Sequence, residues 1–223
     1  MRAAVRWIAR GLAAGVVLLC AAILALRVVD PPLTPLMLWN APRFGVTKQW
    51  VDLDRISPAL VRAVIAAEDA RFPEHHGVDW QAIRDAREFN ARHGDEPRRG
   101  GSTITMQCAR NVFLWQGKSY VRKALEVAIA YAIELAWGKR RILEVYLNVI
   151  EWGPGVYGAE AAARTNFRVP AADVGRWQAA LLAAALPNPH RWVPSAPTRY
   201  LLARARLIER RATNVRLGAL APD

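Results

Sequence analysis

The chain has 223 residues, of which 53% are hydrophobic and 22% charged, so it can bury one core and is not a disordered protein. Its formal net charge of +12 predicts an anionic partner, which could be a nucleic acid, an acidic membrane surface or a phosphorylated substrate. The two cysteines, Cys20 and Cys108, are poorly placed to pair, and the sequence offers neither a disulfide framework nor a Cys/His metal cluster.

The N-terminus contains an uncharged apolar run over residues 11–26, with arginines on both sides of it. We expect a cytoplasmic tail over residues 1–10 and a transmembrane anchor over residues 11–29, because basic residues favour the cytoplasmic side of a membrane. A cleaved signal peptide is one alternative, but no convincing Ala-x-Ala site follows the run. A buried core helix is the other, and the basic flanks at the extreme N-terminus argue against it.

The prolines after this run indicate a linker, which we place at residues 30–44, and a single domain follows over residues 45–218. Helical spacing of apolar residues dominates this domain. Capping residues and apolar periodicity together predict helices over residues 58–68, 119–137, 140–148, 173–186 and 198–218. Residues 88–101 and 151–158 are expected to form loops. No run alternates strictly enough to predict a strand, so the fold class is mainly α.

The first motif with chemical meaning begins with Glu68 and Asp69. Glu68 continues the apolar helix face that Val61 and Ile65 begin. A carboxylate on such a face is partly desolvated, which raises its pKa and makes it a better general base. The alternative is a structural carboxylate that only pairs with a nearby arginine such as Arg71.

The second motif runs from Gly100 to Asn111, and its first residues open a helix. Glycines before hydroxyl residues permit close backbone approach, and the free N–H groups of a helix start suit an anion. Arg110 lies on a later turn of the same helix. An ordinary loop with a Ser or Thr cap explains the pattern equally well.

The third motif places Arg122 and Lys123 one helical turn before Glu126. It is either a solvated ion pair or a cationic clamp for a diphosphate, beside a second carboxylate. The fourth motif begins at Lys139 and ends at Asn148. Its leucines are expected in the core, whereas Asn148 either caps a helix or binds a ligand.

The order and spacing of these motifs carry more information than any one of them. Glu-Asp-x-x-Phe-x-x-His-x-Gly, Gly-Gly-Ser-Thr-x-Thr-x-Gln, Arg-Lys-x-x-Glu and Lys-x-x-Ile-Leu-Glu-x-Tyr-Leu-Asn together closely resemble the peptidoglycan glycosyltransferase family. That family includes the transglycosylase module of bifunctional penicillin-binding proteins. The resemblance covers about residues 50–194, and no Ser-x-x-Lys set of a transpeptidase follows. The chain therefore looks like the monofunctional biosynthetic transglycosylase.

The resemblance implies a lysozyme-like glycosyltransferase domain behind the transmembrane helix. The donor would be a growing glycan on undecaprenyl diphosphate and the acceptor lipid II. Glu68 would take the proton from the acceptor hydroxyl in an inverting transfer, and Glu126 would orient or protonate near the leaving group. The other positions carried over as substrate-binding are Asp69, Phe72, His75, Gly101, Ser102, Thr103, Gln107, Arg110, Asn111, Arg122, Lys123, Lys139 and Asn148.

The resemblance also sets the expected surroundings of the enzyme. No cofactor is required, although Mg²⁺ or Mn²⁺ could assist at the substrate diphosphate. The expected partners are lipid II, the lipid-linked glycan, the membrane and other cell-wall synthesis proteins, with no nucleic acid. The expected location is the bacterial inner membrane, with one span and the catalytic domain on the periplasmic side.

Two rival functions use the same residues differently. A lysozyme-like lytic glycosidase would share the catalytic glutamate but would need no cationic clamp for a diphosphate. A membrane-tethered basic module that binds nucleic acid would fit the charge, but no recognised nucleic-acid motif is present.

Overall fold

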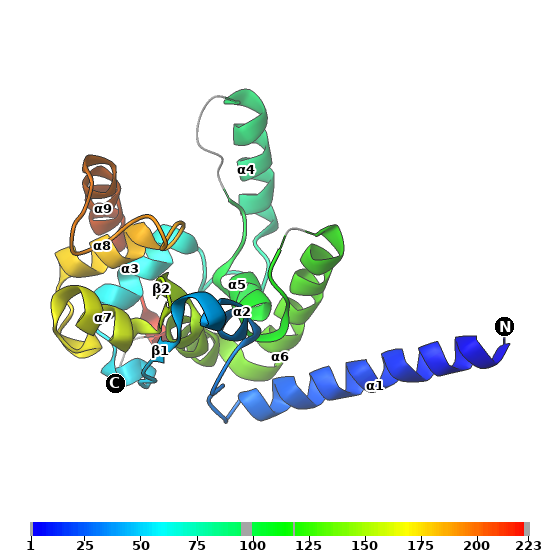
Figure 1. The fold of residues 1–223 in the computed structure, drawn as a ribbon. Helices are drawn as coiled ribbons and strands as arrows, with labels where there is room; N and C mark the ends of the chain where they lie inside the picture. Colours follow the sequence, from blue (N-terminus) through cyan, green and yellow to red (C-terminus); the bar gives the residue numbers. More distant parts are fainter. Residues whose placement is uncertain (1, 95–99, 118, 221–223) are drawn as a thin grey trace.

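The computed structural model describes residues 2–94, 100–117 and 119–220, and this part of the chain is built mainly of helices, as expected (Figure 1). The α-helices are α1 (Arg2–Leu26), α2 (Pro35–Phe44), α3 (Pro58–Glu68), α4 (Trp80–Arg92), α5 (Ile104–Phe113), α6 (Tyr120–Val149), α7 (Ala159–Phe167), α8 (Arg176–Ala185) and α9 (Arg199–Ala212). Short strands are β1 (Thr47–Lys48), β2 (Glu151–Gly153) and β3 (Val156–Tyr157), and 3-10 turns occupy Leu53–Arg55, Ala171–Asp173 and Gly218–Leu220.

The core lies where α3, α5, α6 and α8 meet. α5 packs along α6, while α3 packs against α8 and α9. α8 contributes buried alanines, including Ala180 and Ala184, which are fully inaccessible to solvent. Because alanine side chains are small, α3 can approach the backbone of α8 closely. This packing holds the C-terminal end of α3 in a fixed place.

The predicted helix caps are largely confirmed. The Ser57 hydroxyl accepts a hydrogen bond from the Ala59 amide at 3.2 Å, and Pro58 occupies the first helical position of α3. Ser119 and Thr198 cap α6 and α9 in the same way. Such caps satisfy amide groups that have no partner within the helix, so they fix where each helix begins.

α6 contains the break that the sequence predicted between residues 137 and 140. Gly138 has φ 72° and ψ 164°, a conformation that glycine adopts without steric cost, and it divides α6 into two helical segments. The break lies between Trp137, which is 7% exposed, and Lys139.

α4 is a helix that the sequence analysis missed, because residues 88–92 were expected to form a loop. The Asp79 carboxylate caps α4 by accepting a hydrogen bond from the Ala82 amide at 2.8 Å. An aspartate immediately before a helical segment is a recognisable start signal. The rest of that predicted loop is described only at residues 93–94 and 100–101, and residues 95–99 lie outside the described part of the chain.

Three further boundaries differ from the prediction. Asp173 ends a 3-10 turn, and α8 begins after Gly175, whose amide donates to the Gln178 side chain at 3.0 Å. α9 ends at Ala212 rather than at residue 218, because tight i to i+3 hydrogen bonds such as Val215 N to Ala212 O (3.2 Å) close the helix. Residues 151–158 contain strands β2 and β3, which pair antiparallel, while β1 pairs parallel to β3.

The segment expected as a linker is helical over most of its length. Thr34 caps α2, and its hydroxyl accepts from the Met37 amide at 3.3 Å. Met37 is fully buried, and α2 packs against α5. Residues 35–44 are therefore part of the folded body rather than a flexible connection.

α1 projects from the body of the molecule as a long rod (Figure 1). Among the described residues it is the helix long and apolar enough to cross a membrane, over Ala4–Leu26, with a mean hydropathy of 2.3 and 6% of the window buried. It begins earlier and ends earlier than the predicted span of residues 11–29. The helix therefore fits a membrane anchor.

α1 is fastened to the body by contacts that we call the anchor joint, made by Trp137 and Arg141 of α6 with main-chain carbonyls of the chain after residue 22. The Trp137 indole N–H donates to the Ile23 carbonyl at 2.6 Å. The Arg141 guanidinium donates to the carbonyls of Leu26 (3.1 Å) and Val29 (2.9 Å). Because the last carbonyls of a helix have no partner within it, these bonds complete the end of α1 and fix its direction.

Candidate active site

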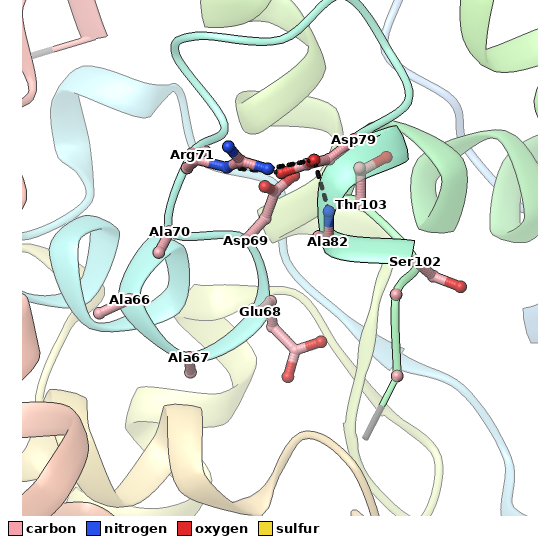
Figure 2. A pocket seen from close by; sticks show the side chains of 12 residues that line it. Ala66, Ala67, Glu68, Asp69, Ala70, Arg71, Asp79, Ala82, Ser102 and Thr103 are labelled. Carbon is pink, nitrogen blue, oxygen red and sulfur yellow. Dashed lines mark hydrogen bonds and ion pairs between the residues drawn. The ribbon is translucent and has the colours of Figure 1, made fainter. Parts of the chain in front are cut away.

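Glu68 is the last residue of α3 and lines a cavity of about 230 Å³ (Figure 2). The helix α3 supplies one wall, the segment before α5 supplies the opposite wall, and α4 contributes Ala82 and its cap Asp79. Figure 2 shows the Glu68 carboxylate between these walls. The lining residues are Ala66, Ala67, Glu68, Asp69, Ala70, Arg71, Asp79, Ala82, Gly100, Gly101, Ser102 and Thr103.

The Glu68 carboxylate is fixed on one side and free on the other. The Gln107 side-chain amide donates to Glu68 Oε2 at 2.8 Å, and the Tyr146 hydroxyl donates to Gln107 Oε1 at 3.3 Å. Glu68 Oε1 has no hydrogen-bond partner among the described residues. One oxygen is therefore available to a group bound in the cavity.

Burial raises the pKa of Glu68, because the ionised form loses solvation. The hydrogen bond from Gln107 and the charges of Arg204 and Arg110 act in the opposite direction, and the charge of Asp69 adds to the rise. A carboxylate with a raised pKa and a free oxygen has the properties of a general base.

Asp69 lies in the cavity wall, but its oxygens are used by the protein. His75 Nε2 lies 3.0 and 2.9 Å from the two Asp69 oxygens, and the Ile104 amide donates to Oδ2 at 2.9 Å. These bonds tie the end of α3 to the start of α5. Asp69 and His75 therefore position the segment that carries Glu68.

The opposite wall is formed by Gly101, Ser102 and Thr103. A side chain at Gly101 would place its Cβ 2.8 Å from the Ile83 Cα, so only glycine lets this segment pass so close to α4. The Thr103 hydroxyl caps α5 and donates to the Gly77 carbonyl at 2.6 Å. The predicted opening of a helix by this motif is confirmed.

One cation of the third motif, Lys123, contacts the cavity wall at Ser102. The Lys123 ammonium donates to Ser102 Oγ at 2.8 Å and to Glu126 Oε2 at 2.9 Å, and Arg122 pairs with the other oxygen of Glu126. The Glu126 side chain is 2% exposed and does not line the cavity, whereas the Lys123 side chain is 44% exposed. This geometry favours an orienting role for Glu126 over proton transfer.

A second cavity, of about 220 Å³, lies on the other side of Gln107. It is lined by Arg110 and Asn111 of the second motif, by Tyr146 of α6, by Leu36 of α2 and by residues 186–189, which follow α8. Arg110 Nε donates to the Asn111 side chain at 3.4 Å. Gln107 thus separates two hollows, each with a basic side chain at or near its edge.

Three residues expected to bind substrate are occupied within the protein. Phe72 is fully buried, and the Lys139 ammonium lies 4.4 Å from the centre of its ring and 2.7 Å from Glu134 Oε1. Asn148 is also fully buried, and its amide bonds to both the N–H (3.0 Å) and the carbonyl (2.8 Å) of Val51. None of the three lines either cavity, so the geometry gives them supporting roles.

Some contributors were missed by the sequence analysis. Arg71 pairs with Asp79 across the cavity mouth, with Nε 2.9 Å from Oδ2. Burial opposes ionisation of Asp79, but its hydrogen bonds to the Ala82 amide and to Arg71 outweigh this effect and lower its pKa. The cap signal at Asp79 could have revealed this pair. Arg204 comes from the last helix, and no motif marks it.

Comparison with known proteins identifies a family whose model covers the residues of this site. The family model described as Transglycosylase matches residues 39–213. A biosynthetic peptidoglycan transglycosylase of Rhodospirillum centenum is 50% identical over 220 residues, which cover 97% of this chain and 94% of that protein. Proteins of the same description are 48% identical in Caulobacter vibrioides (90% and 87% covered) and 46% identical in Xanthomonas campestris pv. campestris (95% and 88% covered).

The match includes Glu68, the hydroxyl-rich wall and the cationic residues around Glu126, so the residues that form the cavity lie within the matched range. The helical domain accordingly has the lysozyme-like fold of that family. The chain belongs to the transglycosylase family and is an enzyme of peptidoglycan synthesis.

Proposed function

We propose that Glu68 is the general base with which this enzyme polymerises lipid II into glycan strands. The observation that carries the proposal is the carboxylate itself, which has one oxygen held by Gln107 and the other free in the cavity. Burial raises its pKa, so the carboxylate binds a proton more strongly than an exposed glutamate does.

The reaction then follows from the position of this base. Glu68 takes the proton of the acceptor's sugar 4-hydroxyl while that oxygen forms a bond to the anomeric carbon of the donor. The bond from the anomeric carbon to the diphosphate oxygen breaks, and undecaprenyl diphosphate leaves with the bonding electrons. Attack from the face opposite the leaving group inverts the anomeric configuration.

The leaving diphosphate needs positive charge near the cavity. Lys123 is the best-placed residue, because its ammonium contacts Ser102 in the cavity wall and its side chain is 44% exposed. Glu126 holds Lys123 and Arg122 side by side before substrate binds. A cation that is already oriented stabilises the growing negative charge without reorganisation during the reaction.

A divalent cation has no ready-made protein site here. Among the described residues, no group of three or more His, Cys, Asp or Glu side chains is arranged to hold a metal ion. Asp69 and Asp79, the carboxylates nearest to Glu68 in the cavity wall, are bonded within the protein. We therefore propose that Mg²⁺ or Mn²⁺, if bound, is held by the substrate diphosphate, and no catalytic step depends on it.

The substrate's lipid tail explains the anchor. We propose that α1 crosses the bacterial inner membrane once and holds the catalytic domain on the periplasmic side. The arginines at its start, such as Arg2 and Arg6, favour retention of that end in the cytoplasm. A tethered enzyme meets a tethered substrate at a high local concentration. Other cell-wall synthesis proteins are expected partners of this assembly.

The test is polymerisation of purified lipid II by the full chain and by Glu68→Gln. Loss of a general base typically lowers the rate by about 10²–10⁴-fold. Glu88→Gln is the matched control, because Glu88 is an exposed carboxylate of α4 that does not line the cavity. A Glu68→Gln enzyme with the melting temperature and rate of the wild type would refute the assignment, and release of sugars from finished wall would indicate a lytic enzyme instead.

A further inference from the structure

A strongly basic hollow lies next to the catalytic cavity, between α3 and the end of α9. It consists of two clefts of about 580 and 510 Å³ that share Val215 and Arg216 in their linings. The larger cleft also shares Ala66 and Ala70 with the catalytic cavity. In Figure 2 these alanines lie on the side of α3 away from Ser102. The basic hollow thus adjoins the catalytic cavity along α3.

The side chains around this hollow carry excess positive charge. We call it the basic cleft and define it by its four arginines, which are Arg62, Arg176, Arg211 and Arg216. The carboxylates in the same linings are Glu74 and Glu209, so four cations face two anions and the net charge is +2.

The guanidinium groups of these four arginines make no hydrogen bond or ion pair with the part of the chain that the structure describes. Other arginines of the protein are held by carboxylates, as Arg71 is by Asp79 and Arg164 by Glu160. Unpaired guanidinium groups around a concave surface concentrate a positive potential and attract anions. Their planar donor groups are especially suited to carboxylates and phosphates.

The position of the basic cleft decides between these anions. α9 lies at the end of the molecule opposite to the free end of α1, so the cleft is remote from the helix that fits the membrane (Figure 1). Lipid phosphates are therefore a poor match. The shared alanines Ala66 and Ala70 instead connect the cleft to the cavity in which the sugars react. The occupant should be an anionic group attached to those sugars.

We propose that the basic cleft binds the carboxylates of the peptides carried by the glycan, and so holds the strand while its sugars occupy the catalytic cavity. This inference rests on the proposed function, because it assumes a peptidoglycan substrate. Peptides on alternate sugars of that polymer carry free carboxylates, which match the charge and the donor geometry of Arg211 and Arg216. Ala66 and Ala70 line both hollows, so the basic cleft and the catalytic cavity adjoin along α3.

The test is calorimetric titration of the full chain in detergent micelles with a soluble disaccharide–peptide fragment of peptidoglycan. The double variant Arg211→Gln/Arg216→Gln should bind the fragment at least about tenfold more weakly than the wild type. Arg206→Gln is the matched control, because Arg206 is an exposed arginine of α9 that lines neither cleft, and it should bind as the wild type does. Thermal melting of each variant confirms that it is folded.

A second arm uses the same fragment with its carboxylates amidated, which should bind the wild type as weakly as the free fragment binds the double variant. Equal affinity for the free and amidated fragments would overturn the proposal, as would an unchanged affinity of the double variant. Displacement of the fragment by vesicles of anionic phospholipid would assign the cleft to a membrane surface instead. Binding is measured without turnover, so failure to polymerise lipid II would refute the proposed function separately.

Discussion

Replacing Asn148 with alanine should destabilise the protein rather than weaken substrate binding. The Asn148 side chain satisfies both the N–H and the carbonyl of Val51, at 3.0 and 2.8 Å, and Val51 is only 8% exposed. Each buried polar group left without a partner costs about 1–3 kcal/mol. Asn148→Ala strands two such groups, so we expect the free energy of unfolding to fall by about 3 kcal/mol. For a chain of this size that corresponds to a melting temperature lower by about 6–12 °C.

Circular dichroism melting in detergent micelles measures this change, and the KM for lipid II is measured on the folded enzyme at a low temperature. Asn166→Ala is the matched control, because Asn166 is partly buried and makes a single bond, to the Ala162 carbonyl at 3.0 Å. We expect that variant to melt about 1–4 °C below the wild type, since the loss of one modest hydrogen bond costs about 0.5–1 kcal/mol. An Asn148→Ala protein that melts normally but shows a raised KM would refute the structural role and restore Asn148 to the substrate site.

The remaining predictions concern the site and the anchor. Burial raises the pKa of Glu68 and the base must be ionised, so the acid limb of the pH–rate profile should lie at a higher pH than an exposed glutamate would give. Gln107→Leu removes a hydrogen bond that lowers this pKa and should move the acid limb to a still higher pH. An acid limb that does not move in this variant would show that Gln107 does not tune the base. Lys123→Ala should lower kcat/KM for lipid II by about tenfold and also lower the melting temperature, since the buried Glu126 keeps only one cation. Arg141→Ala should loosen the anchor joint, so the rate of polymerisation on liposomes should fall by about tenfold while the rate in detergent is retained. Equal losses of rate on liposomes and in detergent would show that the substitution damages the catalytic domain instead.

Much of the helical framework could be predicted because its signals are local. Ser57, Ser119 and Thr198 each precede a helical pattern and each caps a helix in the structure. The break at Gly138 was also visible, since a glycine before three basic residues interrupts the apolar periodicity. Strands β1 and β3 were not predictable, because each has two residues and alternation needs a longer run.

The site was predictable in part for a different reason. Motif spacing identified Glu68 and Gln107, but the bond between them joins α3 to α5 across 39 positions and follows only from the packing. A sequence cannot say whether a polar residue faces a ligand or its own backbone, which is why Asn148 was assigned to the substrate. Arg204 influences Glu68 from the far end of the chain, beyond the reach of any local pattern.

The anchor joint recognises the main chain, and the anchor's side chains pack against the body only near its end, at Leu19, Ile23 and Leu26. Trp137 and Arg141 donate to the main-chain carbonyls of Ile23, Leu26 and Val29. Every residue type has such a carbonyl, so these bonds do not depend on which residues stand there. These bonds fix the position at which the helix ends, whereas the apolar sequence before Leu19 makes few contacts with the body. A foreign transmembrane helix that is grafted in register and keeps Leu19, Ile23 and Leu26 is thus interchangeable with the native one. Inserting a single residue before Ile23, by contrast, rotates every upstream side chain by about 100° around the axis. Over evolutionary time such an anchor can change its composition to suit a different lipid while the enzyme above it keeps its orientation.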